Sequence, residues 1–106
     1  QDIHGWFPMH VAASQNRVDV VKFLLDHDSA VDARTTGGST PLHIAAREGR
    51  VDAVQLLISR HADTEARTIG GNTPVDLARQ KGHAPIVKLF EEYAISQRSL
   101  KHEQDK

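Results

Sequence analysis

A chain of 106 residues with 39% hydrophobic and 25% charged residues has the size and composition of a single folded domain, unlike a disordered segment. Its formal net charge of -1 lacks the positive excess of a dedicated nucleic-acid binder, and no apolar stretch is long enough to span a bilayer. The sequence contains no cysteine, which excludes disulfide scaffolds, thiolate zinc sites and thiol catalysis within it. We therefore expect a soluble protein of the cytoplasm or nucleus that binds neither nucleic acid nor membranes. Because Gln1 is not a methionine, we also expect the chain to be a piece of a longer protein.

One unit of 33 residues recurs three times along the sequence. The proline of each unit is Pro8, Pro41 or Pro74, and the glycine, alanine and apolar positions around it keep the same phase. A fixed period of this length is the signature of a solenoid built from stacked helical units. The predicted repeats cover residues 2–34, 35–67 and 68–94.

The first copy is the most irregular of the three. Asn16 stands where the middle copy has a glycine at the end of a helix, and asparagine also adopts the left-handed conformation that such an ending needs. Trp6, Phe7 and Met9 have no obvious cover, so we expect them to be exposed. Two interpretations of this end stay open: an upstream repeat is missing, or these residues form a functional face.

The middle copy has the clearest signals for secondary structure. Gly37-Gly38 predicts a tight turn at a hairpin-like tip, because positive φ costs glycine little. Thr40 as N-cap and Pro41 at the first helical position predict a helix that ends at Gly49 in a left-handed cap. A second helix from about residue 52 then carries one buried stripe. The stripe consists of Val54, Leu57 and Ile58.

The third copy is typical of the last unit of a solenoid. Arg79 and Gln80 occupy small or variable positions of the unit, as expected for a charged outer face. Pro85 predicts the start of a final helix that carries apolar residues up to Tyr93. We assign residues 1–95 to a single domain. The polar residues 96–106 form a tail that is either a helix extension or disordered.

Residues 39–49 read STPLHIAAREG and contain a T-P-L-H-x-A core that returns, in degraded form, in the other two copies. On these residues the chain resembles the ankyrin-repeat family over nearly its whole length. The resemblance implies an all-α ankyrin-repeat solenoid of helix-turn-helix units with short β-hairpin tips. It also implies that His10 and His43 are structural, with hydrogen bonds to a neighbouring threonine and to the backbone.

The chain departs from the family pattern after its second helices. Asp28 and His61 replace a usual glycine, and a left-handed residue other than glycine costs roughly 1 kcal/mol or more. We expect these two corners to be locally weak. Asp32 and Glu65 stand where asparagine is common in the family, which puts the usual bonding between neighbouring loops in question.

The residues that suggest catalysis or metal binding lack the required spacing. The histidines form no HExxH motif and no HxxxH pair on one helical face. The segment before the middle helix is a turn and not a nucleophile elbow, and a P-loop lysine is missing. We expect no catalytic activity, no cofactor and no bound metal. The histidines expected to be solvated are His4, His27, His61, His83 and His102.

The resemblance implies a protein-interaction module that binds a partner protein or peptide on the concave face formed by the tips and the first helices. Trp6 and Arg47 are the favoured anchors, because tryptophan and arginine often dominate binding energy. An acidic peptide is one candidate ligand for the arginines, and solvated charge is the alternative. We expect the isolated module to be monomeric. The expected partner-binding residues are Ile3, His4, Trp6, Ser14, Gln15, Arg34, Ser39, Arg47, Glu48, Arg67, Ile69, Asn72 and Lys81.

Two alternatives to this function stay open. In the first, the chain is a regulatory or targeting domain of a larger enzyme whose catalytic domain lies elsewhere. In the second, it is a structural spacer whose concave face binds nothing. The full-length sequence would distinguish the first alternative from a scaffold or adaptor.

Overall fold

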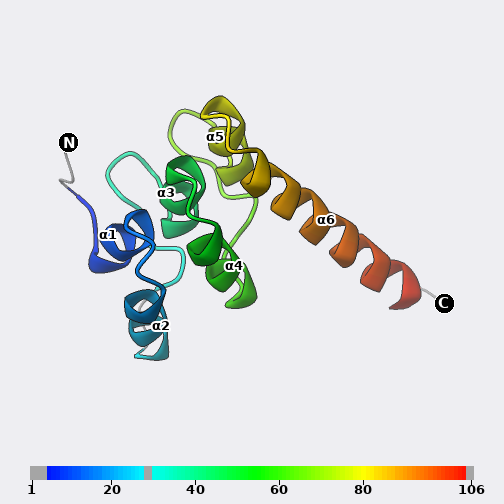
Figure 1. Ribbon diagram of the computed structural model, residues 1–106, viewed down its shortest axis with the longest axis horizontal. Coiled ribbons are helices and arrows are strands. Elements are labelled where there is room, and N and C mark those ends of the chain that lie inside the picture. Colours follow the sequence, from blue (N-terminus) through cyan, green and yellow to red (C-terminus); the bar gives the residue numbers. More distant parts are fainter. Residues whose placement is uncertain (1–4, 28–29, 105–106) are drawn as a thin grey trace.

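The computed structural model describes residues 5–27 and 30–104. Over these residues the chain forms six helices and no strand (Figure 1). The helices follow one another in pairs, one pair for each predicted repeat. In chain order they are α1 (Pro8–Ser14), α2 (Val18–Asp26), α3 (Pro41–Glu48), α4 (Val51–Ser59), α5 (Pro74–Gln80) and α6 (Ala84–Gln104).

The three helix pairs stack side by side as a solenoid with two layers (Figure 1). The first helices α1, α3 and α5 contact one another in one layer, and the second helices α2, α4 and α6 form the other. Ala13 and Ala46 are fully buried in the first layer, where small side chains permit close approach of the helices. Larger apolar side chains such as Leu57 and Ile86 complete the same core. The all-α solenoid predicted from the sequence is therefore confirmed.

Capping residues determine where the first helices begin. The Thr40 hydroxyl accepts a hydrogen bond from the His43 amide at 3.3 Å, and a proline occupies the first position of α3. Thr73 caps α5 in the same way. Phe7 has no hydroxyl, so α1 keeps only the other half of this cap, in which the Phe7 amide donates to His10 Nδ1 at 3.0 Å.

The helix ends contain the left-handed residues that the sequence predicts. Gly49 follows α3 with φ 74°, and Asn16 follows α1 with φ 57°. His61 follows α4 with φ 70°, a conformation that is strained for a residue with a side chain. The corner at Asp28 lies outside the described residues.

The tips between repeats are turns with hairpin-like hydrogen bonds. The Thr35 amide donates to Ser39 O at 2.9 Å, and the next tip repeats this bond. The Ile69 amide then donates to Gly37 O at 3.1 Å, which joins the two neighbouring tips. Such isolated bonds make no ladder, so the expected β-hairpins consist, in the described tips, of turns without strands.

Met9 and Asp32 behave differently from the expectation based on the sequence. Met9 is not exposed, because its side chain is only 2% accessible and packs into the hydrophobic core. The bonding between loops is kept at Asp32, whose carboxylate accepts a hydrogen bond from the Asp63 amide at 3.0 Å. A carboxylate oxygen can accept this bond as an amide oxygen would.

The last helix, α6, continues beyond the repeat stack (Figure 1). Pro85 lies in its first turn, where the missing amide proton disturbs no helical hydrogen bond. The helix includes the polar tail as far as residue 104, and residues 105 and 106 lie outside the description.

Leu57 is fully buried in α4 and belongs to the hydrophobic core. We expect Leu57→Ala to lower the free energy of unfolding by about 2 to 4 kcal/mol, because it removes buried methyl groups and leaves a cavity. Gln55→Ala, at an exposed position of the same helix, should change it by less than about 0.5 kcal/mol. Urea unfolding followed by circular dichroism measures both variants. Equal midpoints would contradict the burial of Leu57.

The left-handed corner at His61 predicts a stabilising substitution. Because the His61 side chain is exposed, His61→Gly should raise the free energy of unfolding by a few tenths to about 1 kcal/mol. Gly49→Ala should have the opposite effect, since Gly49 has positive φ and an added Cβ would lie 2.8 Å from the His83 ring. Thermal and urea unfolding test both. A loss of stability in His61→Gly would show that the imidazole makes a stabilising contact.

Candidate partner-binding surface

Trp6 and Arg47 come from different repeats and meet on the surface formed by the tips and the first helices. Trp6 lies in the segment before α1, and Arg47 lies in the last turn of α3. The Arg47 Cζ atom is 6.0 Å from the centroid of the Trp6 ring, within range of a cation-π interaction. The Arg47 Nε atom also donates to Glu48 Oε2 at 3.2 Å. All three side chains remain partly exposed, so the group forms part of the surface.

The guanidinium groups of Arg34 and Arg67 donate hydrogen bonds to backbone carbonyls of the tips. Arg34 Nη1 donates to Gly38 O at 2.9 Å and to Arg67 O at 2.7 Å. Arg67 Nη1 donates to Gly71 O at 2.9 Å. Both side chains are exposed, so each keeps further N-H donors on the surface while the backbone fixes its position.

Ser14, Ser39 and Asn72 also make hydrogen bonds within the chain. Ser14 Oγ donates to a carbonyl of its own helix at 2.8 Å, and the Ser39 carbonyl accepts from His10 Nε2 at 3.0 Å. Asn72 Oδ1 accepts from Gln80 Nε2 at 3.1 Å. These intramolecular hydrogen bonds fix the positions of the three residues on the surface.

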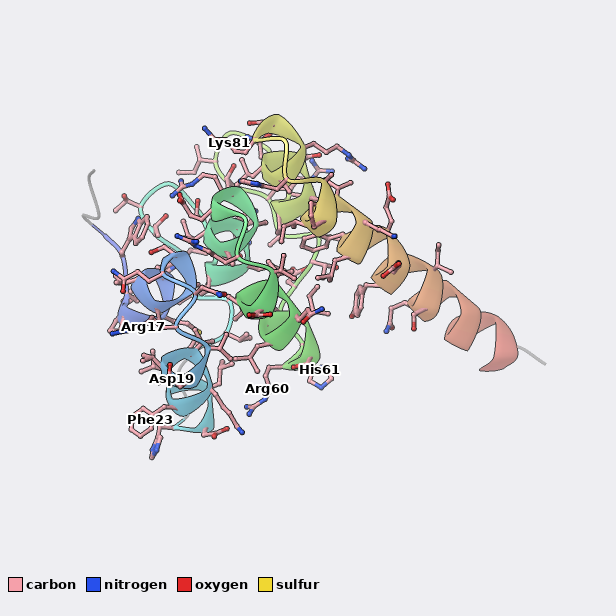
Figure 2. All side chains as sticks on the ribbon, in the orientation of Figure 1. Arg17, Asp19, Phe23, Arg60, His61 and Lys81 are labelled. Atoms are coloured by element: carbon pink, nitrogen blue, oxygen red, sulfur yellow. The ribbon has the colours of Figure 1, made fainter. Side chains whose placement is uncertain are left out.

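Gln15, Ile69 and Lys81 project into solvent. Ile69 is 81% exposed at the tip before α5, Gln15 follows α1, and Lys81 lies at the end of α5 (Figure 2). In the part of the chain that the structure describes, the Gln15 and Lys81 side chains make no hydrogen bond or ion pair. Ile3 and His4 lie outside the described residues.

His10 and His43, the histidines of the repeat motif, are buried and form hydrogen bonds between neighbouring repeats. His43 Nδ1 accepts from the Thr40 amide at 3.0 Å, and its Nε2 atom donates to Asn72 O, in the next tip, at 2.9 Å. His10 Nε2 reaches Ser39 O in the same way at 3.0 Å. The structural role that the family resemblance implies is therefore confirmed in full for His43. For His10 only the bonds to the backbone are present, because Phe7 stands where the other repeats have the threonine.

Both rings are neutral in the folded chain. Burial disfavours the charged imidazole and lowers the pKa of His10 and His43 below the usual 6.5, although backbone hydrogen bonds act in the opposite direction. The geometry requires the same state, because an Nδ1 atom that accepts from an amide carries no proton. The proton of each ring is therefore on Nε2, where it reaches the next tip.

Asp76 stands where the third repeat would have this histidine. Its Oδ2 atom accepts from the Thr73 amide at 3.0 Å, and the hydrogen bonds from Thr73 lower the pKa of the Asp76 carboxyl below its usual range. A carboxylate can thus close the cap of its own helix. It has no N-H group to donate to a further tip.

Arg50 and His83 are inter-repeat donors that the sequence analysis missed. Arg50 Nε donates to Ser14 O at 2.8 Å, and His83 Nε2 donates to Arg47 O at 2.9 Å. The expectation of a solvated His83 is wrong, since the ring is partly buried against the preceding repeat. A signal was present in the sequence, because Arg17, Arg50 and His83 place side-chain N-H donors 33 residues apart.

Within residues 5–27 and 30–104, no group of three or more His, Cys, Asp or Glu side chains is arranged to hold a metal ion. No helix in this part of the chain combines the length and the apolar character of a membrane span.

Stacked helix pairs, turn-shaped tips and buried cap histidines define a helical-repeat solenoid. The family model described as ankyrin repeats (3 copies) matches residues 1–68 and 35–101. The chain therefore belongs to the ankyrin-repeat family, as its sequence motifs predicted. A comparison with curated proteins found no match.

The neutral histidines predict that acid weakens the fold. In the unfolded chain His10 and His43 bind protons near pH 6.5, whereas the folded rings do so only at lower pH. As the pH falls through about 6.5 the unfolded chain therefore binds more protons than the folded chain, so the free energy of unfolding should fall as the pH is lowered from about 7.5 through this value. Urea midpoints across this range measure the loss.

His43→Gln separates this effect from other titrations. Glutamine at this position of the cap can bond to the backbone without titrating, so the variant should be less stable throughout but less dependent on pH. His27→Gln is the matched control because His27 is exposed, and it should keep the pH dependence of the parent chain. If His43→Gln lost as much stability on acidification as the parent, the buried histidine would not be the cause.

Proposed function

We propose that this chain is a non-catalytic interaction module that binds a partner protein or peptide on its concave face, the surface formed by the tips and the first helices. The observation that carries the proposal is the cation-π pair of Trp6 and Arg47, which comes from the first and second repeats and has 6.0 Å between the Arg47 Cζ atom and the ring centroid. Ankyrin repeats are generally protein-interaction modules, which supports the same assignment.

The pair of Trp6 and Arg47 has the properties of an energetic anchor. The planar Arg47 guanidinium already contacts Trp6 and Glu48, so binding removes little further rotamer freedom. The indole offers a large apolar surface with a polar N-H at its edge. A partner that covers the pair would remove both groups from water, and such desolvated aromatic and arginine side chains commonly dominate binding energy.

The charges of the concave face favour an acidic partner. Arg34, Arg67 and Lys81 are exposed on it in addition to the partly exposed Arg47. The two carboxylates of the described first helices each pair with an arginine of their own helix. Complementary negative charge on a partner would speed association and fix its orientation. The second helices carry other exposed carboxylates: Asp19, Asp26, Asp52, Glu91 and Glu92.

A Trp6→Ala, Arg47→Ala double variant tests the anchor. Neither residue belongs to the hydrophobic core, so the helical content and the cooperativity of thermal unfolding should be kept. Affinity for the partner should fall by a factor of about thirty or more, which corresponds to about 2 kcal/mol for a real anchor. The partner is first captured from a cell extract on the immobilised chain and identified by mass spectrometry. Titration calorimetry with the purified partner then gives the dissociation constants.

A Lys22→Ala, Asp52→Ala double variant is the control for the opposite side. Both residues are exposed on second helices, and one positive and one negative charge are removed, so the net charge is unchanged. This variant should bind as tightly as the parent chain. Tight binding by the Trp6→Ala, Arg47→Ala variant, or loss of binding only in the control, would move the partner site to the second helices.

A further inference from the structure

The first repeat has an exposed end face, and the equivalent face of each later repeat is buried. Val20 is 36% exposed, whereas Ala53 and Ile86, at the same position of the 33-residue unit, are 0% and 1% exposed. Each later repeat buries this position against the repeat before it, since α2 contacts α4 and α4 contacts α6. The same contrast holds for Pro8 against Pro41 and Pro74, and for Leu24 against Leu57 and Phe90.

This amino-terminal end face is apolar. Phe7 and Phe23 are 52% and 59% exposed, which is unusual for side chains of this size on a surface without a partner. Figure 2 shows Phe23 on the side of α2 that points away from α3 and α4. A hollow of about 250 Å³ opens on the face, and its lining residues are Phe7, Pro8, Met9, Leu24, Ala30 and Ala33.

A polar donor on the same face points to the kind of occupant. In the later repeats, Arg50 and His83 each donate to a carbonyl of the preceding repeat, at Ser14 and Arg47 respectively. These two carbonyls are themselves 33 residues apart, so the bond is a fixed feature of repeat stacking in this chain. Arg17 occupies the same position in the first repeat. It is exposed, and among the described residues its guanidinium makes no hydrogen bond or ion pair.

The opposite end of the solenoid carries an exposed charged residue that disfavours the stacking of a further repeat. Ala13 and Ala46 are fully buried, whereas the third repeat has Arg79 at this position, exposed and 3.8 Å from Asp76. Stacking another repeat on this end would bury the Arg79 guanidinium, which is costly without a buried partner. The carboxy-terminal end of a second copy therefore does not offer a complementary surface to cover Val20 and Phe23.

We infer that the amino-terminal end face is a repeat-stacking surface, and that its occupant is a further ankyrin-type helix pair joined to the amino-terminal side of α1 in the same polypeptide. Such a pair would cover Val20 and Phe23 with the apolar side of its helices. The last turn of its first helix would supply the carbonyl that Arg17 lacks. With this pair in place, Trp6 lies within a concave face of four repeats and no longer at its end.

An extended chain tests the inference. Residues 35–67 are duplicated ahead of residue 2, which continues the 33-residue period in register. The urea midpoint should rise above that of the 106-residue chain, and hydrogen exchange at the Val20 amide should slow by about tenfold or more, because it would be covered. The matched control carries Ala46→Arg in the duplicated segment only, which places there the residue type of Arg79. This control should lose both gains.

Val20→Glu gives a second readout in both chains. In the 106-residue chain it should lower the urea midpoint only slightly, because Val20 is at the surface, whereas in the extended chain it should remove the gain. Equal exchange at Val20 in the two chains would overturn the inference. So would dimerisation of the 106-residue chain in sedimentation experiments that Val20→Glu abolishes, since the face would then belong to a second copy.

Discussion

None of the first helices is long enough to be stable on its own, because α1, α3 and α5 have 7, 8 and 7 residues. Each must bury one side against its neighbours to offset the cost of ordering its backbone. The fully buried Ala13 and Ala46 allow that approach, and residues such as Leu57 fill the space behind them. Stability is therefore close to a sum over interfaces between adjacent repeats. A strained corner or an uncovered end therefore lowers mainly the stability of the repeat beside it.

The buried imidazoles add direction to this stacking. Apolar contacts set the distance between repeats, and the bonds from His10 to Ser39 O and from His43 to Asn72 O fix each tip relative to the preceding cap. At its other ring nitrogen, Nδ1, each histidine accepts the amide of its own cap, and that bond is lost when Nδ1 gains a proton. The order of the cap and of the tip bound to it therefore depends on pH. Asp76 ends the series, because a carboxylate closes a cap without donating to a further tip.

Features that depend on the backbone preference of one residue could be predicted from the sequence. Thr40 and Gly49 mark the ends of α3 for this reason, and the left-handed conformation of His61 follows from its place in the repeat. Features that depend on two side chains from different repeats could not, since the distance between helices is set by packing. The contact of Trp6 with Arg47 is of this kind. The burial of Met9 is another example, because the sequence analysis wrongly expected this end residue to be exposed.

The same division bears on the proposed partner site. Arg34 and the Ile69 amide join neighbouring tips, so the proposed partner would meet a backbone that is already ordered and would lose little affinity to ordering it. Discrimination would then fall to side chains without structural bonds, such as Lys81, and to the pair of Trp6 and Arg47. A partner that contacts Trp6, Arg47 and Lys81 would span all three repeats. Its binding would stabilise the stacked arrangement of all three repeats. A substitution that separates the repeats would therefore weaken binding even where the substituted residue does not contact the partner.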